Sequence, residues 1–279
     1  MALAEQVTGP VAYHGEGPVW SDGLHWVDML AGDVLSLAPD GSVGRRHVAS
    51  VVAALRPRAT GGFVYAVERG FALDDGPGTS VRALPELWST GALRMNEGGC
   101  DPDGRFYCGT MAYALTPGAA SLYRLDTDGR VAQVLDGLTI SNGLEWSPDG
   151  ALAYYVDSAS GRIDVMDYDA GLGLTGRRPF ARVEAGSPDG LTVDAEGGVW
   201  VAIWGASAVH RYDPAGRLTE VVRLPATHVT ACTFGGPDLA DLYITTSREG
   251  LDDSAEPQAG SLFVWRPGVR GRPVRPYGG

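Results

Sequence analysis

The chain has 279 residues, of which 44% are hydrophobic, so it can bury a sizeable core as one large domain or two ordinary ones. Its 22 basic residues stand against 34 acidic ones, and the net charge of −12 disfavours nucleic acid and anionic membranes, which bind mainly through clustered cations. All 22 basic residues are arginine, which excludes a Schiff-base lysine and a P-loop lysine.

Hydropathy and cysteine usage predict a cytoplasmic protein that does not cross a membrane. The longest mostly apolar stretch, residues 48–55, is far shorter than the roughly 20 residues of a membrane-spanning helix. Residues 1–6 have neither the basic region nor the apolar stretch of a secretory signal. Three cysteines without a C-x-x-C pair indicate neither a disulfide framework nor a thiolate zinc site, and we expect Cys100 and Cys108 to be buried thiols.

Short alternating or β-branched runs follow one another along the whole chain, and no segment sustains a helical apolar period. Each run adjoins turn residues, as in Asp-Pro-Asp-Gly at 101–104 and Ser-Pro-Asp-Gly at 147–150. The clearest predicted strands span residues 24–27, 105–108, 152–156, 198–202 and 242–245. The sequence therefore predicts an all-β protein.

A turn-and-strand motif recurs along the chain with a period of roughly 40 to 50 residues. Its template is Asn-Gly-Leu-Glu-Trp-Ser-Pro-Asp-Gly at 142–150, and weaker or stronger copies share its spacing. The copies begin at Glu16, Ala54, Asn96, Asn142, Asp189 and Thr230. Six such units predict a six-bladed β-propeller with four antiparallel strands per blade, formed by residues 1–279 as a single domain.

The first strand of each propeller blade lines the central channel, so the six starting residues should form a ring around it. Glu16, Asn142 and Asp189 would bring carboxylate and carboxamide oxygens to this ring, and Asn96 a further amide. Oxygen ligands without thiolate or imidazole suit a hard divalent ion such as Ca²⁺, Mg²⁺, Mn²⁺ or Fe²⁺, and Zn²⁺ stays open. The repeats equally allow these residues to do no more than cap the turns that start the strands.

An ordered set of motifs resembles the senescence marker protein (regucalcin)/gluconolactonase/luciferin-regenerating-enzyme family over nearly the whole chain. Each motif is weak alone, whereas several in the right order are specific. They are Gly-Glu-Gly-Pro-Val-Trp at 15–20, Arg-Met-Asn-Glu-Gly at 94–98, Gly-Thr-Met at 109–111, Ser-Asn-Gly at 141–143, Pro-Asp-Gly-Leu at 188–191 and Phe-Gly-Gly-Pro-Asp-Leu at 234–239.

The resemblance implies a six-bladed propeller that holds one divalent metal ion and opens a sugar-acid lactone or a similar small cyclic ester. It implies that Glu16, Asn142 and Asp189 are the metal ligands and that Arg94 and Asn96 contact the substrate. Residues i and i+2 of a strand share a face, so Arg94 and Asn96 can reach one ligand together.

Two acidic residues are candidates for the general base that activates water. Asp189 is the first, although a bound cation would lower the pKa of its carboxylate and weaken it as a base. Glu97 is the second; many relatives have the shorter Asp at this position. The segment 112–118 lacks the acidic substrate contact that relatives often have there, which puts the usual sugar preference in doubt.

Two other functions remain open from the sequence: a non-catalytic Ca²⁺-binding propeller, and a family member recruited to another reaction in a biosynthetic pathway. A scaffold would not need Arg94 and Asn96 beside a metal site. The five histidines show no H-x-x-x-H spacing, so we interpret them as structural, and we interpret Trp204 as a packing residue.

Overall fold

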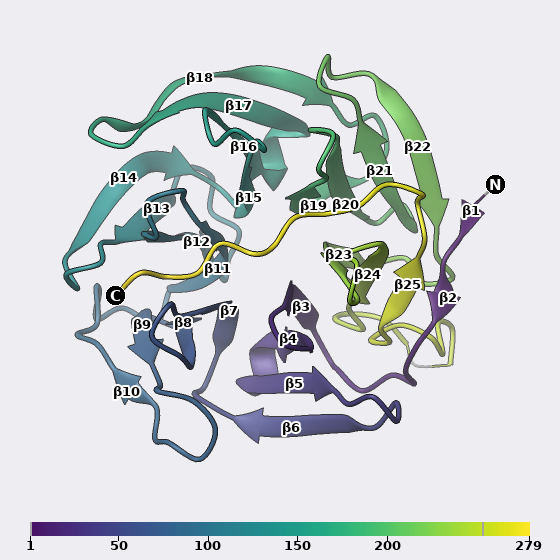
Figure 1. The fold of residues 1–279 in the computed structure, drawn as a ribbon, viewed down its shortest axis with the longest axis horizontal. Coiled ribbons are helices and arrows are strands. Elements are labelled where there is room, and N and C mark those ends of the chain that lie inside the picture. The colour runs from purple at the N-terminus through teal and green to yellow at the C-terminus, as the bar shows by residue number, and fades with distance from the viewer. Residues whose placement is uncertain (1, 253) are drawn as a thin grey trace.

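The computed structural model describes residues 2–252 and 254–279, and it arranges six sheets around a central channel (Figure 1). Each sheet contains a blade of four antiparallel strands, and one sheet has a fifth, parallel strand at its outer edge; this confirms the predicted six-bladed β-propeller. Two short 3₁₀ turns, η1 (Met29–Ala31) and η2 (Ser158–Ser160), are the helical elements of the described residues. In that part of the chain, no helix has the length and apolar character that a membrane crossing requires.

The blades follow chain order, and all five strand predictions correspond to observed strands. Blades 1 to 3 are β3 (Gly15–Trp20), β4 (Leu24–Asp28), β5 (Asp33–Leu37) and β6 (Val43–His47); β7 (Val52–Pro57), β8 (Phe63–Val67), β9 (Gly70–Leu73) and β10 (Arg82–Ala83); and β11 (Leu93–Cys100), β12 (Phe106–Ala112), β13 (Ala120–Leu125) and β14 (Val131–Leu138). Blades 4 and 5 are β15 (Ser141–Trp146), β16 (Leu152–Asp157), β17 (Arg162–Asp169) and β18 (Gly173–Arg182); and β19 (Ser187–Val193), β20 (Val199–Trp204), β21 (Ala208–Tyr212) and β22 (Leu218–Arg223).

The N-terminal segment closes the ring. Blade 6 takes its first three strands, β23 (Val229–Gly235), β24 (Asp241–Thr246) and β25 (Phe263–Trp265), from the end of the chain. Its fourth strand is β2 (Glu5–Gln6), which pairs antiparallel with β25. The strand β1 (Ala2–Leu3) adds to blade 5 in parallel with β22. The two ends of the chain are therefore joined by sheet hydrogen bonds.

Each innermost strand carries a register shift near its start. The shifts lie between Glu16 and Val19, Val52 and Ala54, Met95 and Gly98, Ser141 and Leu144, Pro188 and Leu191, and Val229 and Ala231. A β-bulge redirects the side chain at the irregularity, so the shifts occupy the predicted ring. In blade 2 the unpaired residue is Ala53, one position before the predicted Ala54.

The C-terminal segment crosses one mouth of the channel, as the yellow chain in Figure 1 shows. Its backbone is hydrogen bonded to turns that follow the innermost strands of several blades. The bonds are Ala195 N to Arg270 O (2.8 Å), Gly271 N to Leu239 O (2.8 Å), Tyr277 N to Pro57 O (2.8 Å) and Gly278 N to Gly104 O (2.8 Å). This strap leaves the opposite mouth, where the innermost strands begin, for a functional site.

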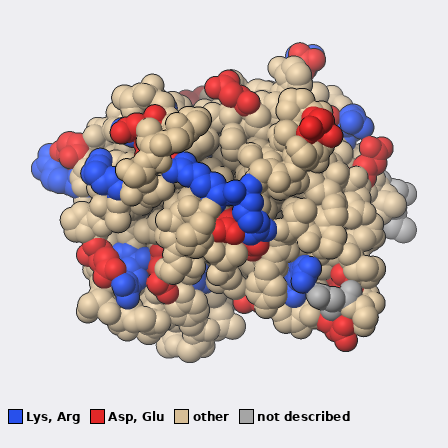
Figure 2. All heavy atoms as spheres, turned by 90° about the horizontal axis from the view of Figure 1, so that it is seen from below, with Lys and Arg blue, Asp and Glu red and all other residues tan. Residues whose placement is uncertain are grey.

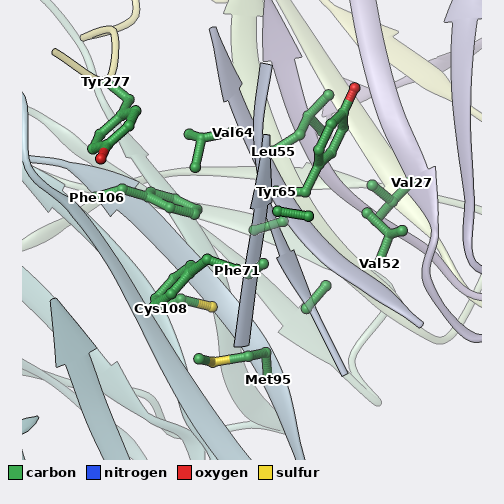
Figure 3. Close-up of a cluster of buried hydrophobic side chains, with 14 of the residues drawn as sticks. Val27, Val52, Leu55, Val64, Tyr65, Phe71, Met95, Phe106, Cys108 and Tyr277 are labelled. Atoms are coloured by element: carbon green, nitrogen blue, oxygen red, sulfur yellow. The ribbon is translucent and has the colours of Figure 1, made fainter. Parts of the chain in front are cut away.

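The core lies between neighbouring blades. Figure 3 shows one cluster in which Val27 of blade 1, Leu55 and Tyr65 of blade 2 and Phe106 of blade 3 contribute buried side chains, with Tyr277 of the strap beside them. On the surface, arginine side chains and carboxylates are interspersed over the face displayed in Figure 2.

Candidate functional site

A cavity of about 450 Å³ lies at the mouth of the channel opposite the strap. It is formed by the starts of innermost strands and by the loops that rise from them. Its lining consists of His14, Glu16, Leu30, Arg94, Asn96, Met111, Tyr113, Leu115, Ile140, Asn142, Ser158, Ala159, Ser187, Asp189, Trp204 and Glu249. Five of the six residues that the sequence nominated for the site are therefore in one cavity, and Glu97 is outside its lining.

The three proposed ligands lie at equivalent positions of blades 1, 4 and 5. Glu16, Asn142 and Asp189 are each at most 6% exposed. Glycine follows Asn142 and Asp189 because the innermost strands approach closely there: a Cβ on Gly143 would stand 2.7 Å from the amide nitrogen of Leu191 and 2.8 Å from the carbonyl oxygen of Asp189. The glycine after Glu16, Gly17, instead takes a positive φ of 48°.

Glu16 and Asp189 are buried carboxylates that repel each other. Burial raises the pKa of Glu16 well above its usual value, and the charge of Asp189 raises it further. Burial likewise raises the pKa of Asp189, followed by the charge of Glu97. Burying a carboxylate without a cation is costly. A divalent cation between these groups would offset both the burial and the repulsion.

Two oxygen atoms at this point have no hydrogen-bond donor among the described residues: Oδ1 of Asn142 and Oδ1 of Asp189, both buried. The Asn142 amide is anchored by its nitrogen, which donates to Ser158 Oγ at 3.0 Å. Ser158 Oγ in turn donates to the carbonyl oxygen of Pro188 at 2.7 Å. The amide oxygen is therefore the free acceptor, and it is the atom a hard cation would bind.

The donor set fits a hard divalent metal ion. It contains two carboxylates and one amide oxygen; in the described part of the chain, no three His, Cys, Asp or Glu side chains form a metal-binding group. Glu16, Asn142 and Asp189 are all more than nine-tenths buried, and the Oδ1 atoms of Asn142 and Asp189 are free to bind a ligand. Hard divalent ions favour such oxygen donors, whereas soft ions favour sulfur.

Arg94 and Asn96 lie together on the cavity-facing side of β11. Arg94 Nη1 donates to Asn96 Oδ1 at 2.6 Å and to the carbonyl oxygen of Met95 at 3.0 Å. Asn96 Nδ2 donates to the carbonyl oxygen of Ser141 at 3.0 Å. Arg94 is 5% exposed, and burial lowers the pKa of its guanidinium. The pair is thus held rigidly, with a cation facing the cavity.

Glu97 is buried next to the cavity and does not line it. Its carboxylate accepts the N–H of Gly98 at 2.9 Å. Burial raises the pKa of Glu97, and the charge of Arg56 opposes that rise. Arg56 is itself hydrogen bonded to the carbonyl oxygen of Gly98. The geometry therefore gives Asp189 the more direct access to a bound molecule.

Eleven of the lining residues were not nominated from the sequence, and His14 and Trp204 are two of them. His14 is 4% exposed, and Ser247 Oγ lies 2.7 Å from its Nδ1. Burial, followed by the charge of Arg94, lowers the pKa of His14 to about 3, so its imidazole is neutral. Trp204 stacks on His228 with ring centroids 3.9 Å apart. The signal for His14 was its position two residues before Glu16, on the same face of an extended segment.

Comparisons with known proteins agree with the fold. Residues 14–248 match the family described as SMP-30/Gluconolactonase/LRE-like region. Regucalcin of Danio rerio is 37% identical over 279 residues, covering 95% of each chain. A Bacillus subtilis (strain 168) protein, YvrE, whose name provisionally assigns it as a sugar lactone lactonase, is 34% identical over 89% of each chain.

A solved structure is similar over nearly the whole chain. It is a calcium-binding protein, regucalcin, from Agrobacterium tumefaciens strain C58, with a TM-score of 0.92 and 29% identity. The match covers 99% of this chain and 97% of that one.

Proposed function

The chain belongs to the SMP-30/gluconolactonase/LRE-like family, and from that premise we propose that it is a metal-dependent hydrolase of a lactone or similar small cyclic ester. The observation that carries the proposal is the meeting of Glu16, Asn142 and Asp189 with Arg94 and Asn96 in one cavity. Ligands for a cation and donors for a substrate share a space of about 450 Å³, the size of a small-molecule site.

The proposed metal ligands are Glu16, Asn142 and Asp189, and the native ion is one of Ca²⁺, Mg²⁺, Mn²⁺, Fe²⁺ or Zn²⁺. The free Oδ1 atoms of Asn142 and Asp189 support this assignment. A divalent ion held there supplies Lewis-acid polarisation of an ester carbonyl.

Arg94 and Asn96 position the substrate. The guanidinium of Arg94 can donate to an oxygen of the lactone, and its bonds to Asn96 and to the Met95 backbone fix its direction. A donor that is already oriented loses little conformational entropy when it binds a ligand. We therefore assign these two residues to substrate orientation and not to proton transfer.

Asp189 is the proposed general base, which would take a proton from the attacking water at its carboxylate. Its position in the cavity lining supports the role. Glu97 is the second candidate. Its raised pKa suits a base, but its carboxylate is bonded to Gly98 and lies outside the lining.

The alternative is a calcium-binding protein without catalysis, and the similar Agrobacterium tumefaciens protein, regucalcin, is a calcium-binding protein. A pure calcium scaffold gives no reason for a buried arginine beside the ligands, whereas a hydrolase does. We also propose a cytoplasmic location, because Cys100, Cys108 and Cys232 are buried free thiols, as expected in a reducing compartment.

The test is lactone turnover with controlled metal content. Chelated protein should open no aldonolactone, and activity should return when one of Ca²⁺, Mg²⁺, Mn²⁺ or Zn²⁺ is added. Asp189→Asn should lower kcat/KM by roughly 100-fold or more, since it removes a ligand and the proposed base. The control is Asp128→Asn, whose carboxylate pairs with Arg130 at the surface, and it should behave as wild type.

Two results would contradict the proposal. Unchanged lactone turnover in protein verified to be metal-free would show that the reaction does not need a metal ion. Calcium binding without turnover of any cyclic ester in a broad panel would favour the non-catalytic alternative.

A further inference from the structure

The cavity has a charged floor and an apolar wall. The floor residues Glu16, Arg94 and Asp189 are at most 6% exposed. Above them stand four apolar side chains, which we call the apolar wall: Met111, Tyr113, Leu115 and Ile140. The floor would hold the reacting carbonyl, and the wall would contact whatever the ring carries.

The apolar wall is built from neighbouring segments of blades 3 and 4. Met111 lies in β12, and Tyr113 and Leu115 follow in the turn that comes directly after this strand. Met111 forms an antiparallel bridge with Ile140, which places these two residues side by side. Ser187 and Glu249, two of the polar lining residues, come from blades 5 and 6.

The rim of the wall displays two large apolar side chains to solvent. Tyr113 is 46% exposed and Leu115 is 53% exposed. Leu115 has φ of 53°, a left-handed conformation that is costly for leucine and natural for glycine, asparagine or aspartate. Its N–H donates to the carbonyl oxygen of Ala112 at 2.9 Å, which closes the turn. The turn itself therefore gives no reason for a leucine at position 115, whereas contact with an apolar ligand does.

The polar atoms closest to the wall are already satisfied. The Tyr113 hydroxyl donates to Glu68 Oε1 at 2.8 Å, so the residue offers mainly its ring to the cavity. Ser158 Oγ is occupied by Asn142 Nδ2 and the carbonyl oxygen of Pro188. Hydroxyl groups of a sugar ring placed against this side would lose water without gaining partners.

We infer that the substrate is a lactone or related cyclic ester with an alkyl or aryl substituent, which packs on the apolar wall formed by Met111, Tyr113, Leu115 and Ile140. The inference rests on the proposed function for the reaction and adds the substrate class. A polyhydroxylated aldonolactone is the poorer substrate, because its substituents match water better than they match the wall. Each methylene group buried on the wall should raise kcat/KM about fourfold.

The test is a series of γ-lactones with lengthening alkyl chains, from γ-valerolactone to γ-nonalactone, compared with glucono-δ-lactone on metal-loaded enzyme. We expect kcat/KM to rise about fourfold per methylene until the wall is covered. For γ-nonalactone, kcat/KM should exceed the kcat/KM for glucono-δ-lactone by more than tenfold. A second readout is the Kd of alkylcyclopentanones, which have the ring carbonyl and cannot be hydrolysed, and which should bind more tightly as the chain lengthens.

Leu115→Asp tests the wall directly, because aspartate tolerates the left-handed backbone that leucine occupies there. This variant should fold, and it should reduce the chain-length gain in both kcat/KM and Kd. Its matched control is Leu172→Asp, a leucine that is 78% exposed in the hairpin between β17 and β18 and should have no effect.

The outcomes separate this inference from the proposed function. Preference for glucono-δ-lactone, with no dependence on chain length, would overturn the inference and leave the lactonase proposal standing. Chain-length-dependent ketone binding that Leu115→Asp abolishes, without turnover of any lactone, would support the apolar ligand class and overturn the hydrolase. If the protein neither turns over a lactone nor binds a ketone, both the inference and the proposed function are overturned.

Discussion

Substituting alanine for Gly143 tests whether the spacing of two blades sets the geometry of the site. The added methyl group would stand 2.7 Å from the Leu191 nitrogen and 2.8 Å from the Asp189 carbonyl oxygen. Both are backbone atoms of β19, so no side chain can turn away. Ordinary contact begins at 3.4 Å, and β19 would have to move by about 0.6–0.7 Å relative to β15.

The expected cost has two parts. Forcing a methyl group into a closely packed place typically costs about 1–3 kcal/mol of unfolding free energy, which lowers Tm by roughly 2–4 °C per kcal/mol in a chain of this size. The same displacement separates the Asn142 and Asp189 side chains. Because a misplacement of about 1 Å can cost about 100-fold in rate, we expect kcat/KM to fall by roughly 10- to 100-fold.

Urea unfolding of metal-free protein measures the first part. Lactone kcat/KM, together with calorimetric titration with Ca²⁺ or Mn²⁺, measures the second. Gly91→Ala is the control, because a Cβ there meets no atom within 4 Å and its φ is outside the left-handed region. If Gly143→Ala matched wild type in stability and in metal affinity, the account of blade spacing would be wrong.

Two further substitutions probe the site and its support. Arg94→Ala removes one or two charge-assisted bonds of about 1.5–3 kcal/mol each, so it should lower kcat/KM roughly tenfold to ten-thousandfold while circular dichroism stays unchanged. The surface variant Arg130→Ala should match wild type, and equal activity per folded molecule in Arg94→Ala would make Arg94 structural. Asp74 is buried; although burial opposes its ionisation, hydrogen bonds from the Tyr65 hydroxyl and the Phe63 N–H hold its pKa below the usual value. The ionised Asp74 carboxylate stabilises the fold above its unfolded-state pKa, and this stabilisation is lost as pH falls through its folded-state pKa. Asp74→Asn should therefore unfold at a lower urea concentration than wild type at pH 7, and the difference should shrink below about pH 4. A difference that does not change with pH would contradict this.

The propeller was predictable because each blade repeats its own local signals. Turns such as Asp-Pro-Asp-Gly at 101–104 form within a few residues, and the hydrogen bond from Gly104 N to Asp101 O (3.1 Å) is of this local kind. In blade 2 the predicted ring residue Ala54 pairs with Ala66, and the unpaired residue is Ala53. The turn after this strand holds two consecutive glycines, Gly61 and Gly62, so the sequence alone leaves its register ambiguous by one residue.

The rest of the molecule depends on contacts between distant segments. Strands β1 and β2 have two residues each, too few for a periodic pattern, and they are defined by partners more than 200 residues away. The cavity lining is equally non-local. Trp204, the last residue of β20, lines the cavity and forms an isolated bridge with His228, and this contact cannot be read from the sequence. Glu97 has the residue type of a general base and is next to Asn96 in the sequence. Whether its side chain faces the cavity depends on the bulge between Met95 and Gly98, which the sequence does not reveal.

The most direct test of the central claim is anomalous diffraction from crystals of the protein soaked in Mn²⁺. The account predicts one channel peak, with oxygens of Glu16, Asn142 and Asp189 each about 2.0–2.6 Å from it, and no such peak in Asp189→Asn crystals. Ordered crystals that show no peak among these three residues, or a peak held by other side chains, would contradict it.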